Sequence, residues 1–251
     1  MKYLVLLGGL ALAVGNSHRV DALEVAIGQT RIELVGPKDF CPLDKNHSLD
    51  SQAINLIQQT VQGRNELLAV FIDCARLADW HDGKTDDIGD TFEFQVSLTA
   101  KNVNANKASV TDICSVLRKQ GAEIAKTMEG VMATNVKAIQ ELAGKIEFNA
   151  LEMYGVLHED DTGCYFGSVL KMKIEDKVEL HFNVSAVTAV RNRLVVANHS
   201  SDFKDESTVQ RLLATSQATV AAFRARNPDE RVSLVDSILR WFISKTLGID
   251  R

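Results

Sequence analysis

The twelve-residue stretch DWHDGKTDDIGD, residues 79 to 90, holds five aspartates, one histidine and one tryptophan. Carboxylate oxygens on a tight turn are the ligands that hard cations such as calcium prefer. The candidate ligands for such a cation are Asp82, Asp86, Asp87 and Asp90. The competing interpretation is a solvated hairpin connection, in which aspartate and glycine supply the turn geometry and Trp80 folds onto the edge of a sheet.

An EF-hand does not fit this stretch. Counted from Asp82, the third position of the loop is Lys84 and the sixth is Asp87, where an EF-hand needs an oxygen ligand and a glycine. Glu93, at the twelfth position, falls in an alternating strand pattern and not on a helix. Any cation site here would therefore be of another kind.

Acid–base chemistry by histidine is the second possibility, because an unperturbed imidazole titrates near neutral pH. The Trp80-His81-Asp82 triplet is the candidate centre of a hydrolase, with or without a metal ion. The sequence contains no G-x-S-x-G, H-E-x-x-H, G-x-x-x-x-G-K-[ST] or G-x-G-x-x-G motif, so no catalytic residue and no cofactor is assigned. We interpret His47, His81, His158, His181 and His199 as surface residues.

The N-terminal residues predict export. Lys2 gives a positive start, residues 3–14 form an apolar run, and Val20-Asp21-Ala22 offers a cleavage site, so residues 1–22 are expected to be a signal peptide. The apolar run is shorter than the roughly 20 residues of a spanning helix. We expect a periplasmic or secreted protein with no transmembrane segment after the signal peptide.

Removal of the signal peptide leaves 26 basic and 32 acidic side chains, since Lys2, Arg19 and Asp21 leave with it. Mild acidity without a basic cluster argues against nucleic acid as a partner. About 230 residues suffice for one domain with its own core. We therefore expect a single domain over residues 23–227, followed by a separate segment at residues 228–251.

Four cysteines in an exported chain favour two disulfides. They lie at least 33 residues apart, unlike the close pairs that most zinc sites use. The order of the expected elements places Cys41 and Cys74 at one end of the sheet, and Cys114 near Cys164 at the other. The predicted bonds are therefore Cys41–Cys74 and Cys114–Cys164.

The hydrophobic periodicity predicts an α+β fold, an antiparallel sheet of six or seven strands flanked by helices. Residues 91–99 alternate between apolar and polar side chains, so we expect that strand to have one face in water. The expected strands are residues 31–35, 67–73, 91–99, 146–157, 164–174, 178–190 and 193–197. Three helices are expected: a first one capped by Ser48, a second one over residues 110–143 and a third one over residues 206–226.

This order of elements resembles the PsbP-like α/β/α sandwich, over residues 31–227 and without a signature motif. Proteins of that fold serve mainly as accessory and binding proteins, and the resemblance implies the same kind of role here.

Residues 229–251, DERVSLVDSILRWFISKTLGIDR, predict an amphipathic C-terminal helix. Its apolar face includes Leu234, Ile238, Trp241 and Phe242, and basic residues lie in its second half. Such a face packs on its own domain, on a protein partner or on a membrane surface.

Two hypotheses follow. The preferred one is a non-catalytic exported accessory, binding or interaction protein of the cell envelope. The other is an exported hydrolase, with or without a metal ion, that uses the Trp80-His81-Asp82 loop.

Overall fold

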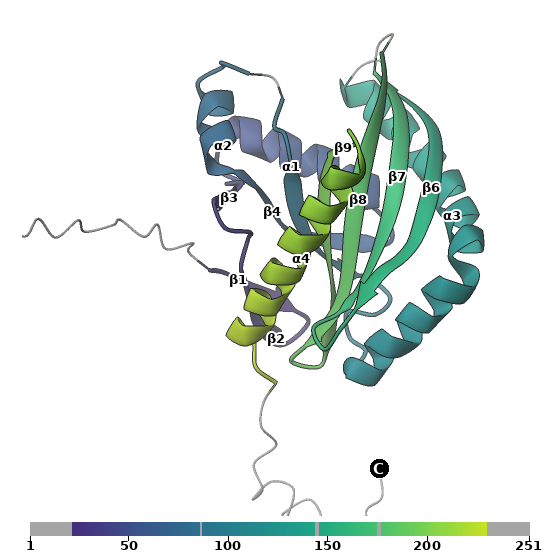
Figure 1. Cartoon of the computed structure of the whole chain (residues 1–251). Coiled ribbons are helices and arrows are strands. Elements are labelled where there is room, and N and C mark those ends of the chain that lie inside the picture. Colours follow the sequence, from purple (N-terminus) through teal and green to yellow (C-terminus); the bar gives the residue numbers. More distant parts are fainter. Residues whose placement is uncertain (1–21, 86, 144–145, 175–176, 230–251) are drawn as a thin grey trace, which may run out of the picture.

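Figure 1 shows a computed structural model of the chain, which describes residues 22–229 apart from residue 86, residues 144–145 and residues 175–176. The fold is α+β, as predicted, with a seven-stranded antiparallel sheet in the order β3-β4-β5-β9-β8-β7-β6 and a two-stranded sheet, β1-β2. The strands are β1 (Leu23–Ile27), β2 (Thr30–Leu34), β3 (Phe40–Pro42), β4 (Asn65–Asp73), β5 (Thr91–Ser97), β6 (Ile146–Glu159), β7 (Cys164–Ile174), β8 (Lys177–Val190) and β9 (Arg193–Asp202). The helices are α1 (Ser48–Val61), α2 (Cys74–His81), α3 (Lys107–Ala143) and α4 (Glu206–Arg226).

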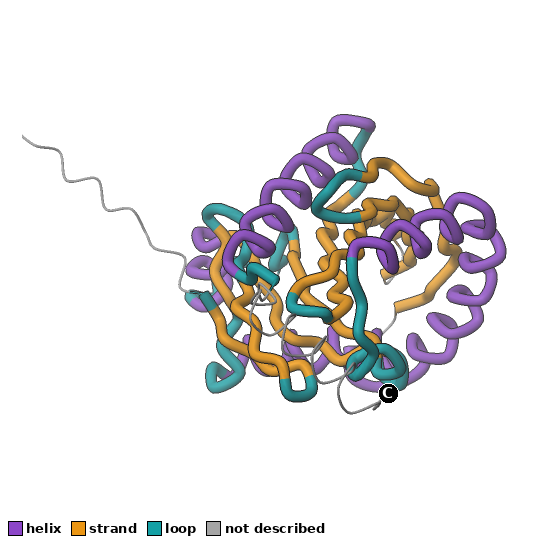
Figure 2. The backbone as a smooth tube through the Cα atoms, turned by 90° about the horizontal axis from the view of Figure 1, so that it is seen from below, coloured by secondary structure: helices purple, strands orange, loops and turns teal. Residues whose placement is uncertain are grey.

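Helices cover both faces of the large sheet (Figure 2). On one face, Phe94 of β5 packs with Phe223 of α4 inside the main apolar cluster. On the other face, Ile54 of α1 packs against Val70 of β4, while Cys114 of α3 packs with residues of β7 and β8. Burying apolar surface on two sides of one sheet supplies the main driving force for this fold.

The strands from β6 to β9 form a meander in which each neighbour pairs antiparallel with the next. Their predicted order and the short turns between them are confirmed, and α4 begins and ends where the periodicity placed it. The largest difference is at the end of β9, which continues to Asp202 instead of stopping at Ala197. In addition, β6 ends two residues later than predicted and β8 begins one residue earlier. The polar residues at the end of β9 pair with β5 and β8, so backbone hydrogen bonding outweighs their side-chain polarity.

Strand β5 corrects a second expectation. It lies inside the sheet between β4 and β9, and its polar face is turned toward the side covered by α1 and α3. Gln95 is buried and Glu93 is only partly exposed, so this face is not the open, solvated one that the alternation suggested.

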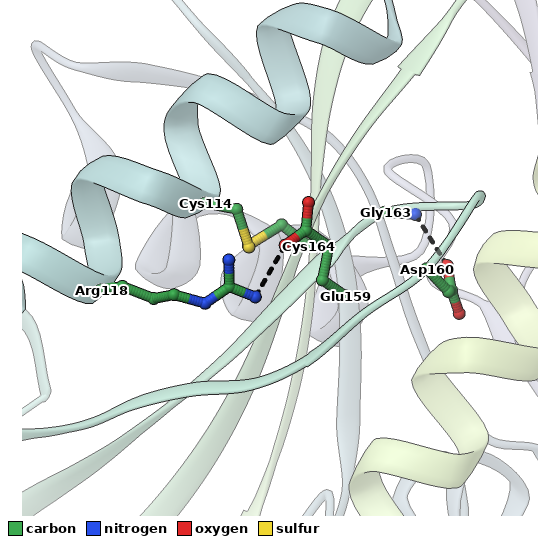
Figure 3. The surroundings of a disulfide bond; sticks show 6 residues. All are labelled: Cys114, Arg118, Glu159, Asp160, Gly163 and Cys164. Carbon is green, nitrogen blue, oxygen red and sulfur yellow. Dashed lines mark hydrogen bonds and ion pairs between the residues drawn. A yellow bond between two sulfur atoms is a disulfide. The ribbon is translucent and has the colours of Figure 1, made fainter.

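Both predicted disulfides form. Cys41 and Cys74 have Cα atoms 4.9 Å apart, and Cys114 and Cys164 have Cα atoms 5.7 Å apart. Figure 3 shows the second bond, next to which Arg118 of α3 pairs with Glu159 at the end of β6 at 2.7 Å.

None of the helices within the described part of the chain is long and apolar enough to cross a membrane. The expected signal peptide, apart from Ala22, and the expected C-terminal helix with Leu234, Ile238, Trp241 and Phe242 lie outside the described residues.

Candidate functional site

Two imidazole nitrogens, one at the start of α1 and one at the end of α2, converge on one carboxylate oxygen of Asp50. Nδ1 of His47 lies 3.0 Å from Oδ1 of Asp50, and Nε2 of His81 hydrogen-bonds the same oxygen. The two imidazole rings lie face to face, with centroids 3.8 Å apart and planes tilted by 34°. Among the described residues, these three are the ones grouped closely enough to hold a metal ion, with all ligand atoms within 4.8 Å of one another. We call them the His–Asp–His cluster.

The start of α1 positions two members of the cluster. His47 is the N-cap and Asp50 the third helical residue, so a helix beginning with Ser48 brings both side chains to its N-terminal end. The backbone N–H of Asp44 donates to the other oxygen of Asp50 at 2.8 Å. Asn46 in turn donates to the Asp44 carboxylate from its backbone and its side-chain amide. A negative charge in the first turn also suits the helix dipole.

Helix α2 positions the third member and covers residues 79–81, the start of the stretch that was predicted to be a loop. Asp73 caps its start by accepting from the N–H of Arg76 at 2.9 Å. Its end is a Schellman motif, in which the N–H groups of Gly83 and Lys84 donate to the carbonyls of Trp80 and Asp79. Gly83 has φ +68°, a conformation that glycine adopts without strain. His81 is therefore the last residue of a defined helix.

Packing of α2 on the sheet fixes the direction of His81. Leu77 and Trp80 lie in the apolar cluster around Val70 and Ile72 of β4, so Trp80 rests against the sheet as expected. The indole ring of Trp80 lies 5.8 Å from the imidazole of His81, centroid to centroid.

The electrostatics of Asp50 favour the carboxylate form although the residue is only 1% exposed. Burial acts to raise the pKa of Asp50, but the hydrogen bond from Asp44 and the contacts with His81 and His47 outweigh it and lower the pKa below its usual value. The His–Asp–His cluster therefore contains a buried anion.

This donor set suits a divalent transition metal ion. Two imidazole nitrogens and one carboxylate oxygen are ligands that zinc and its neighbours in the first transition row accept. The side chains of His47 and His81 are 40% and 29% exposed, whereas Asp50 is buried, so the cluster faces solvent on the imidazole side. Three protein ligands with an accessible side leave coordination positions for water or another molecule.

Three of the four candidate calcium ligands in the acidic loop, residues 79–90, are described, and each contacts a different cationic side chain. Asp82 pairs with Lys84 at 2.8 Å, Asp87 pairs with Arg76, and Asp90 pairs with Arg211 of α4. Asp86 lies outside the described residues, so a cation site formed by these four aspartates stays a prediction. Of the Trp80-His81-Asp82 triplet, only His81 belongs to the His–Asp–His cluster.

His199 corrects the interpretation of the histidines as surface residues. It is 1% exposed because β9 runs on past it, and it lies between the rings of Phe40 and Phe92. Its Nδ1 lies 3.4 Å from the carbonyl of Leu212. Burial lowers the pKa of His199 to about 4, although the carboxylate of Asp90 acts in the opposite direction. His199 is therefore a neutral core residue.

A hydrogen-bonded polar row crosses the sheet on the side of α1 and α3. Glu93 of β5 lies opposite Asn198 of β9, which lies opposite Ser185 of β8. Ser185 donates to Asn198 at 2.7 Å, and Gln95 donates to Glu93 at 2.8 Å. Burial raises the pKa of Glu93 to about 7, against the opposing effect of the Gln95 hydrogen bond.

The sequence matches no protein-family model and no curated protein. The functional argument therefore depends on the residues themselves, and foremost on the His–Asp–His cluster.

Proposed function

We propose that this chain is an exported accessory or binding protein of the cell envelope that holds a divalent transition metal ion, zinc in the first instance, at His47, Asp50 and His81. The observation that carries the proposal is the convergence of two imidazole nitrogens on one buried carboxylate oxygen. To bind a metal ion, His47 would need a proton-free Nδ1 and His81 a proton-free Nε2, so each neutral imidazole would carry its proton on the other nitrogen.

Export is supported by the two disulfides, because such bonds persist in oxidising compartments. Strand β1 also begins at Leu23, the residue that cleavage after Ala22 would leave first. N-terminal sequencing of the protein recovered from the periplasm or the medium should start at Leu23. A chain that keeps Met1 and stays in the cytoplasm would contradict export.

Zinc binding is tested by titration of the purified mature chain against a chromophoric chelator. The wild type should bind one zinc ion per chain. Asp50→Asn keeps the side-chain size but removes the charge, and should weaken binding by more than about 100-fold, the upper range for loss of a supporting partner. The matched control is Asp82→Asn, an exposed residue paired with Lys84, which should bind zinc like the wild type.

The two variants also separate the two candidate cation sites. If Asp82→Asn lost zinc while Asp50→Asn kept it, the acidic loop would be the metal site and the His–Asp–His cluster would not. If neither variant differed from the wild type, both assignments would fail.

Metal-assisted hydrolysis is a second candidate function, and the number of ligands favours it. Catalytic zinc sites have three protein ligands and an open position, at which bound water has its pKa lowered to about 7. The zinc-loaded chain should then hydrolyse a chromogenic ester or phosphoester, and Asp50→Asn should not. Zinc binding without turnover of either substrate would support the binding protein.

A further inference from the structure

The two disulfides differ in their exposure to solvent. Cys114 and Cys164 are both 0% exposed, inside the apolar cluster beneath α3. Cys41 and Cys74 are both partly exposed. A reductant in solution therefore reaches the Cys41–Cys74 bond more readily than the other one.

The exposed disulfide joins the two segments that carry the His–Asp–His cluster. Cys41 lies in β3, a strand of three residues, and the chain runs from there directly through Asp44 to His47 and Asp50. Cys74 is the first residue of α2, and His81 is the last. The S–S bond therefore links the segment that carries two ligands to the helix that carries the third.

Besides the disulfide, a backbone hydrogen bond and the packing of two side chains hold α2 against β3 and β4. The N–H of Cys74 donates to the carbonyl of Asp39 at 2.9 Å, and Leu77 and Trp80 pack on the sheet. The helix has eight residues, fewer than the roughly 12 to 15 that an isolated helix needs to be even marginally stable in water. Loss of the covalent link should therefore allow α2, and His81 with it, to move away from Asp50.

We propose that the Cys41–Cys74 disulfide controls the metal affinity of the His–Asp–His cluster, and that its reduction by a dithiol releases the ion. This inference rests on the proposed metal binding. One thiolate of the dithiol attacks a sulfur of the Cys41–Cys74 bond, which breaks to leave a mixed disulfide and one cysteine thiolate. The second thiol then displaces the other cysteine. Two electrons and two protons pass to the protein, and the dithiol leaves as a disulfide.

The test measures zinc affinity of the full mature chain in its oxidised form and as Cys41→Ser/Cys74→Ser. Serine is used because free thiolates would themselves bind zinc. The double variant should bind zinc at least about tenfold more weakly than the wild type, the lower range for loss of ligand orientation. The matched control, Cys114→Ser/Cys164→Ser, lies away from the cluster and should keep the wild-type affinity.

A second measurement uses the wild type alone, in case a double variant fails to fold. The zinc-loaded protein is titrated with a phosphine reductant, and the freed thiols are alkylated as they form so that they cannot bind zinc. Opened disulfides are identified by peptide mapping, and released zinc is followed with the chelator. Zinc release should accompany opening of Cys41–Cys74 while Cys114–Cys164 is still intact. Retention of zinc after Cys41–Cys74 has opened, or equal affinity of the double variant and the wild type, would overturn redox control but leave metal binding in place. Absence of zinc binding by the oxidised wild type would overturn both.

Discussion

Nε2 of His81 hydrogen-bonds Oδ1 of Asp50 across 31 positions of sequence. Asp50 lies in the first turn of α1 and His81 in the last turn of α2, and β4 lies between these helices in the chain. The contact therefore depends on the tertiary structure, which brings together two of the three members of the His–Asp–His cluster.

Gly83→Ala tests whether the end of α2 positions His81. Gly83 has φ +68°, which costs a residue with a Cβ about 1 kcal/mol, while no atom within 4 Å would meet the new methyl group. We expect a loss of about 1 kcal/mol in the free energy of unfolding and weaker zinc binding, measured by urea denaturation and chelator competition.

The matched control is Gly121→Ala in the middle of α3, where there is also open space but no positive φ. That change should stabilise the protein by about 0.5–1 kcal/mol and leave zinc binding unchanged. If Gly83→Ala behaved in the same way, the termination of α2 would not constrain the cluster.

His199 should make the protein lose stability in acid. Its folded pKa of about 4 lies below the ordinary 6.5, so between these values the unfolded chain binds a proton that the folded chain does not. Stability from this residue is complete above pH 6.5 and falls by about 3 kcal/mol as the pH drops to 4. His199→Phe should therefore make the midpoint of urea denaturation depend less on pH between pH 4 and 6.5 than it does in the wild type.

Gln210→Ala, an exposed change on α4 that removes no titratable group, serves as the control and should keep the acid dependence of the wild type. An unchanged pH profile in His199→Phe would show that the buried imidazole is not the group that titrates.

Glu93, in contrast to His199, should make the protein lose stability as the pH rises. Its folded pKa of about 7 lies above the ordinary 4.5, so the folded chain holds a proton that the unfolded chain releases between these values. Stability from Glu93 is complete below pH 4.5 and is lost as the pH rises through 7, by no more than about 3 kcal/mol, since the side chain still contacts water.

Glu93→Gln should therefore gain stability relative to the wild type as the pH rises from 5 to 8, measured by thermal unfolding. Glu152→Gln, on the exposed side of β6, should show no such gain. If the stability of Glu93→Gln and of the wild type changed in parallel with pH, the raised pKa of Glu93 in the polar row would be excluded.

Asn227 joins the end of α4 to the small sheet. Its amide exchanges two hydrogen bonds with the backbone of Glu33 in β2, at 2.8 and 2.7 Å, and the residue is 2% exposed. Asn227→Ala leaves these backbone groups without partners and should cost about 1–3 kcal/mol in the free energy of unfolding. Gln210→Ala, exposed on α4, should change it by less than about 0.5 kcal/mol.

Much of the fold could be predicted from local sequence. Apolar periodicity and short turns located α3, α4 and the meander from β6 to β9, because those signals lie within each element. The same order of elements predicted both disulfides, since it determines which end of the sheet each cysteine occupies.

The candidate site could be predicted only in part. His81 was singled out, but as part of the Trp80-His81-Asp82 triplet, because α2 has only eight residues and so gives a weak helical pattern. A usable signal was present in Asp73, which caps the helix, and in Gly83, which ends it. The pairing of His81 with His47 and Asp50 depends on how α1 and α2 pack together on β4, which no local pattern encodes.

Anomalous diffraction from crystals of the oxidised chain soaked in zinc tests the central claim most directly. Data collected on either side of the zinc absorption edge should give a peak about 2.0–2.2 Å from Nδ1 of His47, Nε2 of His81 and an oxygen of Asp50. A zinc peak in the acidic loop instead, or no peak at the His–Asp–His cluster, would contradict the account.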